Sequence, residues 1–389
     1  MKQRHIQHLY WRAGFGIGVK KIDQLKSKSK NEIIKDLFYD ASKVNLLQLD
    51  LSEFNLIKNK SPKVLKIEMG EEAYRKLRQK SQRKVRDLNY AWLERLTGPS
   101  SILREKMTLF WSNVFVCRDN HIFHIQHFNN TFRKNALGNF RVLVKTIAKE
   151  ASMSKYLNNR QNRKKSPNEN FARELMELFT LGIGNYTEQD IKEAARAFTG
   201  WSFKLNGDFV LRKKQHDAGV KTFFDKSGYF GGDDIIDLIL EKKQCARFIC
   251  DKVYRYFVNP IVDPRHLDEI TTIFFKDYDI NNLMMYIFNA KWFYNDENIG
   301  VKIDFNDYKL RAENKQCLFY DRDRGEKNKE ATTLKDESAL LEFAFESCDA
   351  EVVYMFAYGS WYVYDNSDKI GNSSYQFIEL EEALYNVLA

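Results

Sequence analysis

The stretch from residue 166 to residue 201 constrains the fold more than any other part of the chain. It reads SPNENFARELMELFTLGIGNYTEQDIKEAARAFTGW and contains two sets of helix start and stop signals. In its first half, apolar residues recur at intervals of three and four, which predicts a helix with one buried face. Ser166, Pro167 and Glu169 predict the start of this helix as its N-cap, first helical residue and capping-box carboxylate.

The second half of the same stretch predicts a second helix. Gly182 and Gly184 end the first helix, because glycine adopts the left-handed conformation without strain. Thr187 has the position of an N-cap, with Asp190 three residues later as its capping-box partner, and Gly200 marks the end. We therefore expect a rigid helical hairpin whose polar side is rich in Asn, Glu and Arg.

Helical periodicity continues through most of the chain, and only 5 prolines occur in 389 residues. The exception is WSFKLNGDFVLR, residues 201–212, which alternates around Asn206-Gly207 and predicts a β-hairpin. The expected fold is mainly α, a multi-helix domain with one small β-hairpin. Helices are predicted at 4–13, 20–27, 30–39, 63–97 with a break near Gly70, 101–117, 232–241, 243–257, 264–276 and 280–291.

A change in composition predicts a domain boundary near residue 302. Residues 1–302 hold 53 Lys and Arg against 35 Asp and Glu, whereas residues 303–389 hold 9 against 18. Two β-rich runs and two helical segments predict that residues 303–389 form a small, acidic α+β module. The basic helical domain favours an acidic partner or a polyanion, and it equally suits docking of its own acidic C-terminal part.

The N-terminal residues are polar, and no run of about 18 apolar residues occurs. We therefore expect a soluble, cytoplasmic chain without a transmembrane segment. The 5 cysteines are scattered, without a CxxC pair, which favours buried free thiols over a disulfide framework or a zinc site.

Two classes of function remain open: a binding or accessory protein, and a hydrolase-like enzyme. The enzyme hypothesis rests on polar residues that could transfer protons or orient a substrate near the helical hairpin. The catalytic candidates are Glu169, Arg173, Glu174, Glu177, His216 and Asp217, with Asn168 and Asn170 as binding candidates. The simpler interpretation is that Arg173 forms i,i+4 pairs with Glu169 and Glu177 that support a helix surface. No P-loop, HExxH or GxSxG motif is present, and no cofactor follows from the sequence.

The binding hypothesis rests on the densest basic run, RKLRQKSQRKVRD, at residues 75–87. Here Arg75, Arg78, Arg83 and Lys84 are candidates for neutralising the charges of a polyanion, including nucleic-acid phosphates. Helical charge runs are more often solvated faces, so nucleic acid is the weaker interpretation. A second basic run, RQNRKK, precedes the helical hairpin at residues 160–165.

Three of the 7 histidines, His121, His124 and His127, lie in one short span. Residues three apart share a helix face, but the third member drifts by about 120°. Convergence of all three on one metal would require distortion, so we assign no metal and treat them as weak candidates. A set of hydrogen-bonded or solvent-facing histidines is the alternative.

Several ordered motifs resemble the bacterial family known as domain of unknown function 1800. They are HLYWRAGFG at 8–16, LREKMTLFW at 103–111, KNALGNFR at 134–141, the stretch 167–201, and HDAGVKTF at 216–223. The resemblance implies a helix-rich fold and export of many members. It also implies a partner, an alkaline-phosphatase or sulfatase-like protein encoded nearby, but no catalytic residue or cofactor.

The chain departs from this family pattern in two places. Ser112 and Val114 stand where members commonly carry histidines in the form W-H-x-H-F, so any metal role of that pair is absent here. The family's proline- and glycine-rich C-terminal part is not visible after residue 302.

Overall fold

The computed structural model describes residues 1–299, 352–357, 360–365 and 379–380. The chain divides into two units, Met1–Ile299 and Gly300–Ala389. In the second unit, β5 (Val352–Ala357), β6 (Ser360–Asp365) and β7 (Glu379–Leu380) form an antiparallel sheet in that order. The helical segment predicted at residues 338–347 lies outside the described residues. The other was predicted at residues 379–389, but its first two residues, Glu379 and Leu380, form β7.

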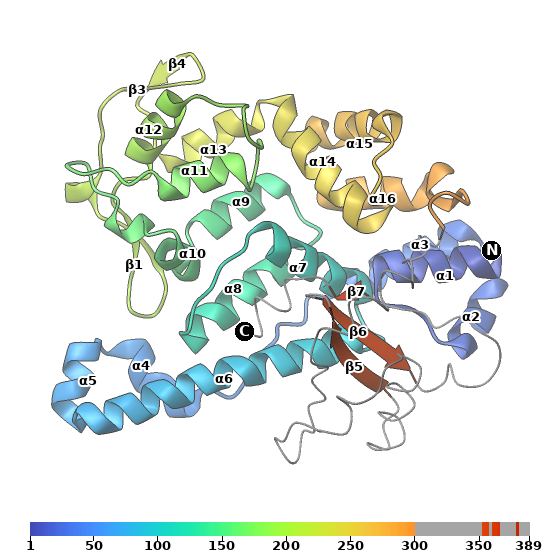
Figure 1. Ribbon diagram of the computed structural model, residues 1–389, viewed down its shortest axis with the longest axis horizontal. Coiled ribbons are helices and arrows are strands. Elements are labelled where there is room, and N and C mark those ends of the chain that lie inside the picture. Colours follow the sequence, from blue (N-terminus) through green and yellow to red (C-terminus); the bar gives the residue numbers. More distant parts are fainter. Residues whose placement is uncertain (300–351, 358–359, 366–378, 381–389) are drawn as a thin grey trace. The chain divides into compact units, whose positions relative to one another are not determined.

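The first unit is mainly helical, which confirms the predicted fold class (Figure 1). No helix of the described residues is long and apolar enough to cross a membrane. The helices are α1 (Gln3–Ala13), α2 (Val19–Lys26), α3 (Lys30–Ser42), α4 (Asn55–Asn59), α5 (Pro62–Met69), α6 (Glu71–Thr97), α7 (Ile102–Val114), α8 (Ile122–Asn135), α9 (Phe140–Ala148), α10 (Ala151–Tyr156), α11 (Asn170–Glu177), α12 (Glu188–Ala197), α13 (Gly232–Leu240), α14 (Lys243–Phe257), α15 (Pro264–Asp277) and α16 (Ile280–Asn289).

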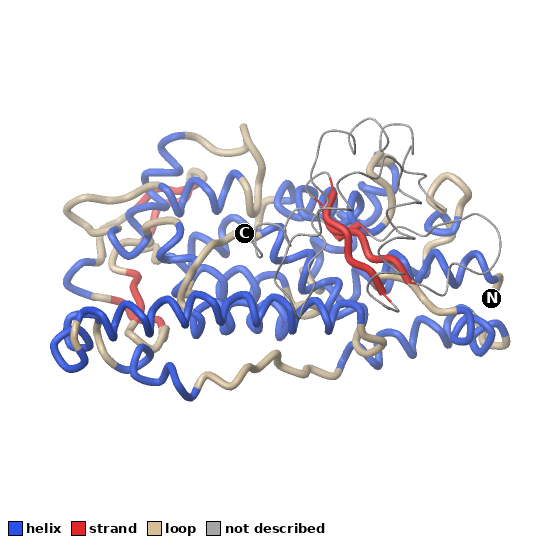
Figure 2. Tube along the Cα trace, turned by 60° about the horizontal axis from the view of Figure 1, so that its bottom comes forward, coloured by secondary structure: helices blue, strands red, loops and turns tan. Residues whose placement is uncertain are grey.

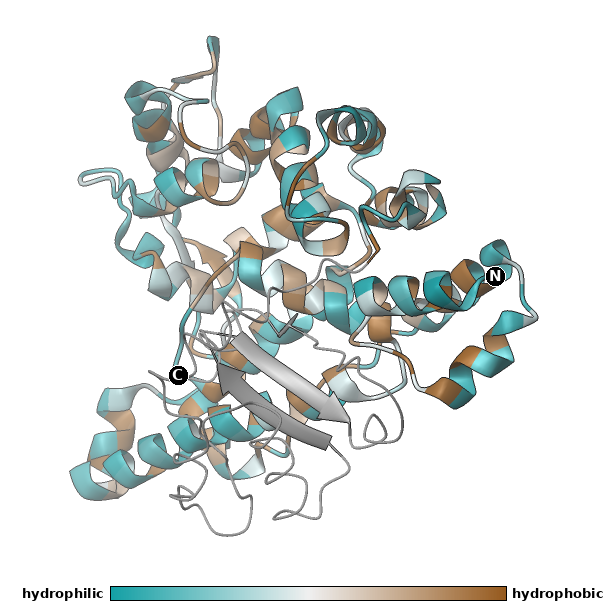
Figure 3. Cartoon of the chain, turned by 45° about the vertical axis from the view of Figure 1, so that its right-hand side comes forward, coloured by the Kyte–Doolittle hydropathy of each residue, from teal (hydrophilic) through white to brown (hydrophobic). Residues whose placement is uncertain are grey.

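The core is built around α7, which contacts α1, α3, α6 and α8. Most helices show one hydrophobic side and one hydrophilic side, as expected for helices that pack on a common core (Figure 3). Helix α7 differs because even its polar residues Arg104, Glu105 and Lys106 are buried. Such buried charges require partners, since an unpaired charge in the interior is very costly.

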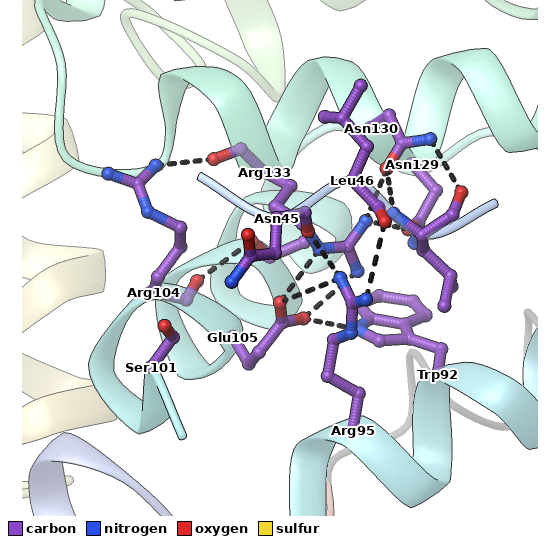
Figure 4. Close-up of polar contacts among 12 residues, drawn as sticks. Asn45, Leu46, Trp92, Arg95, Ser101, Arg104, Glu105, Asn129, Asn130 and Arg133 are labelled. Atoms are coloured by element: carbon purple, nitrogen blue, oxygen red, sulfur yellow. Dashed lines mark hydrogen bonds and ion pairs between the residues drawn. The ribbon is translucent and has the colours of Figure 1, made fainter. Parts of the chain in front are cut away.

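Glu105 and Arg133 of α8 form the centre of a buried polar network (Figure 4). The guanidinium donates to both carboxylate oxygens, with Nε–Oε1 2.8 Å and Nη2–Oε2 2.9 Å. Trp92 of α6 donates from its indole nitrogen to the same carboxylate at 3.1 Å. Arg133 also donates to the side-chain oxygens of Asn129 and Asn130, both at 2.7 Å. The network therefore ties α6, α7 and α8 together.

The same network holds the extended segment 43–51, which runs beside α6 (Figures 1 and 2). Asn130 accepts from the backbone N–H of Leu47 and donates to its carbonyl, each at 2.8 Å. Arg95 of α6 donates to the carbonyls of Asn45 and Leu46. No strand of the described residues pairs with this segment, and side chains bond to several of its backbone groups instead.

The predicted break near Gly70 is confirmed. Gly70 has a φ of 83° and separates α5 from the long helix α6. Ser61 caps α5, and Pro62 is its first residue. The two helices fold against each other with α4 as an arm formed by residues 55–81 (Figure 1).

The predicted start of the first helix in the 166–201 stretch is wrong. Helix α11 begins at Asn170, and Ser166 instead pairs with Arg163 in an isolated β-bridge. The Asn168 backbone N–H donates to Asn162 Oδ1 at 2.9 Å, and the Asn168 side chain accepts from the Asn170 N–H at 3.1 Å. These hydrogen bonds compete with helix formation and delay the start by one turn.

The start of the second helix agrees with the prediction. Thr187 caps α12 and forms a capping box with Asp190. Gly200 has a φ of 77°, and a Cβ there would lie 2.8 Å from the carbonyl oxygen of Arg212. A side chain at this position would therefore disrupt the loop that packs on the end of α12.

The predicted hairpin is present, with β1 (Trp201–Phe203) paired antiparallel to β2 (Phe209–Leu211). A second hairpin, β3 (Lys221–Phe223) with β4 (Lys226–Gly228), was not predicted. Its turn places Phe224 and Asp225 at φ 49° and 63°, a conformation usually signalled by glycine or asparagine. The turn therefore lacks the local sequence signal that identified the first hairpin.

The burial of His8 predicts how the free energy of unfolding depends on pH. The side chain is fully buried beside Phe293, with ring centroids 4.5 Å apart, and burial lowers its pKa to about 3. An unfolded histidine binds a proton below about pH 6.5, whereas folded His8 does not, so stability falls as pH drops from 6.5 towards 3. Between pH 7 and pH 5, the unfolding free energy should fall by about 2 kcal/mol more in the wild type than in His8→Phe. Urea titrations at several pH values measure this, and parallel profiles would contradict it.

Candidate functional site

A cavity of about 630 Å³ opens between the 55–81 arm, residues 119–124 and the β1–β2 hairpin. We call it the cationic cavity. Its lining residues are Ile57, Lys60, Pro62, Leu65, Lys66, Tyr74, Arg78, Ser81, Asp119, Asn120, His121, His124, Lys155, Arg160, Phe203, Lys204, Leu205 and Arg212.

The lining carries seven Lys and Arg side chains and one carboxylate. Three of the cations are paired with acidic groups: Lys60 with Glu68, Lys66 with Glu71, and Lys155 with Asp119. The other four have no ion pair with any residue that the structure describes. They are Arg78, Arg160, Lys204 and Arg212. The cavity therefore has an excess of positive charge.

Asp119 is the centre of the cavity wall. Its carboxylate accepts from Lys155 Nζ at 2.9 Å, Ser152 Oγ at 3.0 Å and the His121 backbone N–H at 3.1 Å. His124 Nδ1 lies 3.4 Å from Asp119 Oδ2. Burial opposes ionisation, but the contacts with His124 and Lys155 prevail and hold the pKa of Asp119 well below its usual range. Asp119 thus fixes the loop before α8 as a charged anchor.

His121 and His124 are stacked, with ring centroids 3.9 Å apart. Burial is the main cause that lowers the pKa of His121 to about 3, followed by the nearby His124 and Lys155. His121 is therefore neutral at physiological pH. Its Nδ1 atom is buried and has no hydrogen-bond partner among the described residues.

The third histidine of the span points elsewhere. His127 Nδ1 lies 3.0 Å from Glu150 Oε2, and this hydrogen bond is the main cause that raises the pKa of His127. His127 and Glu150 line a second cavity of about 420 Å³, which also contains His124. In the part of the chain that the structure describes, no three His, Cys, Asp or Glu side chains come together as metal ligands. His121 thus lines the cationic cavity, His127 lines the second cavity, and His124 lines both.

The candidate residues of α11 do not line either cavity. Arg173 donates to both carboxylate oxygens of Glu188 at 2.8 Å and to Glu169 at 3.3 Å. Glu177 accepts from the Tyr186 hydroxyl at 2.9 Å, so it does not form the expected pair with Arg173. These contacts connect α11 to α12 and its preceding loop.

His216 and Asp217 hold the loop after β2 against the end of α12. His216 Nδ1 lies 2.8 Å from the Thr199 carbonyl oxygen, and Asp217 pairs with Arg196 at 2.8 Å. The Arg196 hydrogen bond is the main cause that lowers the pKa of Asp217. The two side chains have separate partners, so the geometry does not join them into a proton-transfer pair.

The basic run on α6 is divided by its helical geometry. Tyr74, Arg78 and Ser81 share one face and line the cationic cavity, whereas Arg75 and Arg83 do not. Lys84 does not line it either and pairs with Asp87 at 3.0 Å. Asn168 and Asn170 also lie outside both cavities, and their hydrogen bonds shape the start of α11.

Sequence reasoning did not identify Asp119, Arg212 or Phe203 as site residues. They belong to segments far apart in the chain, and no motif connects them. The basic run RQNRKK gave a partial signal, since Arg160 is its first residue.

Residues 8–305 match the family described as "Protein of unknown function (DUF1800)". No curated protein and no solved structure matches the chain.

Substitution of Glu174 tests whether this carboxylate has a structural role in the helical hairpin. Glu174 is half-buried, its side chain has no hydrogen bond to a described residue, and burial followed by the charge of Glu177 raises its pKa. A raised carboxyl pKa means that ionisation disfavours the folded state above that pKa. Glu174→Gln should therefore leave the melting temperature at pH 7 unchanged or slightly higher.

The matched control is Glu177→Gln on the same helix, which weakens the bond with Tyr186 and should lower the melting temperature slightly. Differential scanning calorimetry measures both variants. A large loss in Glu174→Gln would show that this carboxylate supports the hairpin.

Proposed function

The chain belongs to the DUF1800 family, and we propose that its helical unit is a binding protein that holds a polyanion in the cationic cavity. One observation carries the proposal: four cations without an acidic partner among the described residues line a single cavity. They come from α6, the turn after α10 and the β1–β2 hairpin. Cations from separate elements converge on one space, which differs from a charge run on one helix.

Physical chemistry favours an anion in this cavity. Arg78, Arg160 and Lys204 are exposed, so an anion can reach these like charges, although water partly screens their mutual repulsion. A bound anion relieves this repulsion and gains charge-assisted hydrogen bonds from guanidinium groups. The excess of positive charge in residues 1–302 also attracts anions over longer distances.

The concave shape favours a chain of phosphates or sulfates over a folded acidic protein. Such a protein would contact a broad surface, including the outer residues Arg75 and Arg83. The hydrolase-like alternative on α11 and α12 has less support, because Arg173, Glu177, His216 and Asp217 all have structural partners.

Inorganic tripolyphosphate is a suitable probe for the cavity. We expect Arg78→Gln/Arg160→Gln to bind it about 10-fold or more weakly than the wild type, because each lost charge-assisted contact contributes about 1 kcal/mol. Isothermal titration calorimetry measures the affinity. Binding by the wild type should also weaken as sodium chloride is raised, since salt screens exposed charges.

The matched control is Arg75→Gln/Arg83→Gln, which removes the same charge from α6 outside the cavity. It should retain affinity within about twofold. An equal loss of affinity in the two double variants would show that general charge attraction causes the binding, and it would contradict a localised site.

A further inference from the structure

The cationic cavity also contains apolar and aromatic surface that an inorganic polyanion would not use. Ile57, Pro62 and Leu65 come from the 55–81 arm, and Phe203 and Leu205 come from the hairpin. Ile57, Pro62 and Leu205 are at least partly exposed, and a ligand with charged groups alone would leave them in contact with water. The lining therefore suits a ligand with both an apolar part and several negative charges.

The rings lie beside the unpaired cations. Tyr74 is one helical turn before Arg78 on α6, and both line the cavity. The Arg160 guanidinium lies 5.0 Å from the centroid of the Phe203 ring. Aromatic rings and guanidinium planes are the surfaces on which nucleic-acid bases stack.

His121 adds a polar group to the same wall. Its ring stacks on His124, it is neutral, and its buried Nδ1 has no hydrogen-bond partner among the described residues. A neutral imidazole offers one donor and one acceptor. Because Nδ1 is buried, the nitrogen of His121 that is available to the edge of a heteroaromatic ring is Nε2.

We propose that the cationic cavity binds a nucleotide unit, with its phosphates on Arg78, Arg160 and Arg212 and its base against Tyr74. This inference rests on the proposed polyanion-binding function and names the class of anion. A volume of about 630 Å³ lies within the range of small-ligand pockets. The same chemistry is offered by a free nucleotide and by a single-stranded nucleic acid.

Adenosine triphosphate and inorganic tripolyphosphate form a matched pair of probes, because they differ by the nucleoside. Calorimetry at one ionic strength without magnesium should give at least about fivefold tighter binding of adenosine triphosphate, from stacking of its base. Equal affinity would overturn the nucleotide inference and leave polyanion binding intact. If neither probe binds, the proposed function fails as well.

Tyr74→Ser tests the stacking surface directly. Tyr74 is half-buried, and the variant should lose most of the preference for adenosine triphosphate while its affinity for tripolyphosphate stays within about twofold. Tyr229→Ser is the control, because Tyr229 is 81% exposed and does not line the cavity. A preference unchanged in Tyr74→Ser would contradict the assignment of the base to this ring.

Two further titrations identify the source of the ligand. Tighter binding of an oligodeoxythymidylate than of thymidine triphosphate would assign the cavity to single-stranded nucleic acid, and similar affinities would assign it to free nucleotides. Lysophosphatidic acid supplies an anion with an acyl chain. Tighter binding of this lipid than of adenosine triphosphate would overturn the inference.

Discussion

The buried ion pair between Glu105 and Arg133 is the constraint on which the helical unit depends. Both side chains are almost completely inaccessible, and each needs the other because a lone buried charge is very costly. Replacing one partner of such a pair generally costs about 3–5 kcal/mol. The pair is weak evidence for high stability, because the loss of hydration of both charges opposes their attraction. Its structural role is to join α6, α7 and α8 through hydrogen bonds among Trp92, Glu105 and Arg133.

This arrangement also determines where the cavity lies. Trp92 and Arg95 fix the C-terminal half of α6 to the network, and the helix continues without a break to Glu71. Because a helix is stiff over this length, the anchored half positions the half that carries Tyr74 and Arg78. The opposite wall is fixed by Asp119, whose contacts join the loop before α8 to Lys155 of α10. The cationic cavity thus lies between two anchored walls.

Local signals predicted much of the fold. The Thr187 capping box, the break at Gly70 and the Asn206-Gly207 turn depend on residues within a few positions of each other, so sequence alone reveals them. The start of α11 was mispredicted because Asn162, a residue outside the expected helix, competes for the backbone of Asn168. The family resemblance is confirmed and covers most of the chain.

The candidate site was less predictable, because it depends on distant contacts. Arg78 was one member of a basic run, and only the packed helix distinguishes it from Arg75. Glu105 looked like part of an ordinary amphipathic helix, since its partner lies 28 positions later on α8. The histidine span was also only partly predictable. Its spacing predicted that the third ring diverges. The contacts of His124 with Asp119 and of His127 with Glu150 depend on residues that the spacing does not reveal.

Hydrogen–deuterium exchange tests most directly whether a ligand binds between these anchored walls. Exchange is compared in the wild-type chain with and without adenosine triphosphate. We expect slower exchange at residues 57–81, 119–124 and 203–212, which are distant in sequence and meet only in the folded unit. Protection confined to α11 and α12, or absent from these three segments, would contradict this expectation.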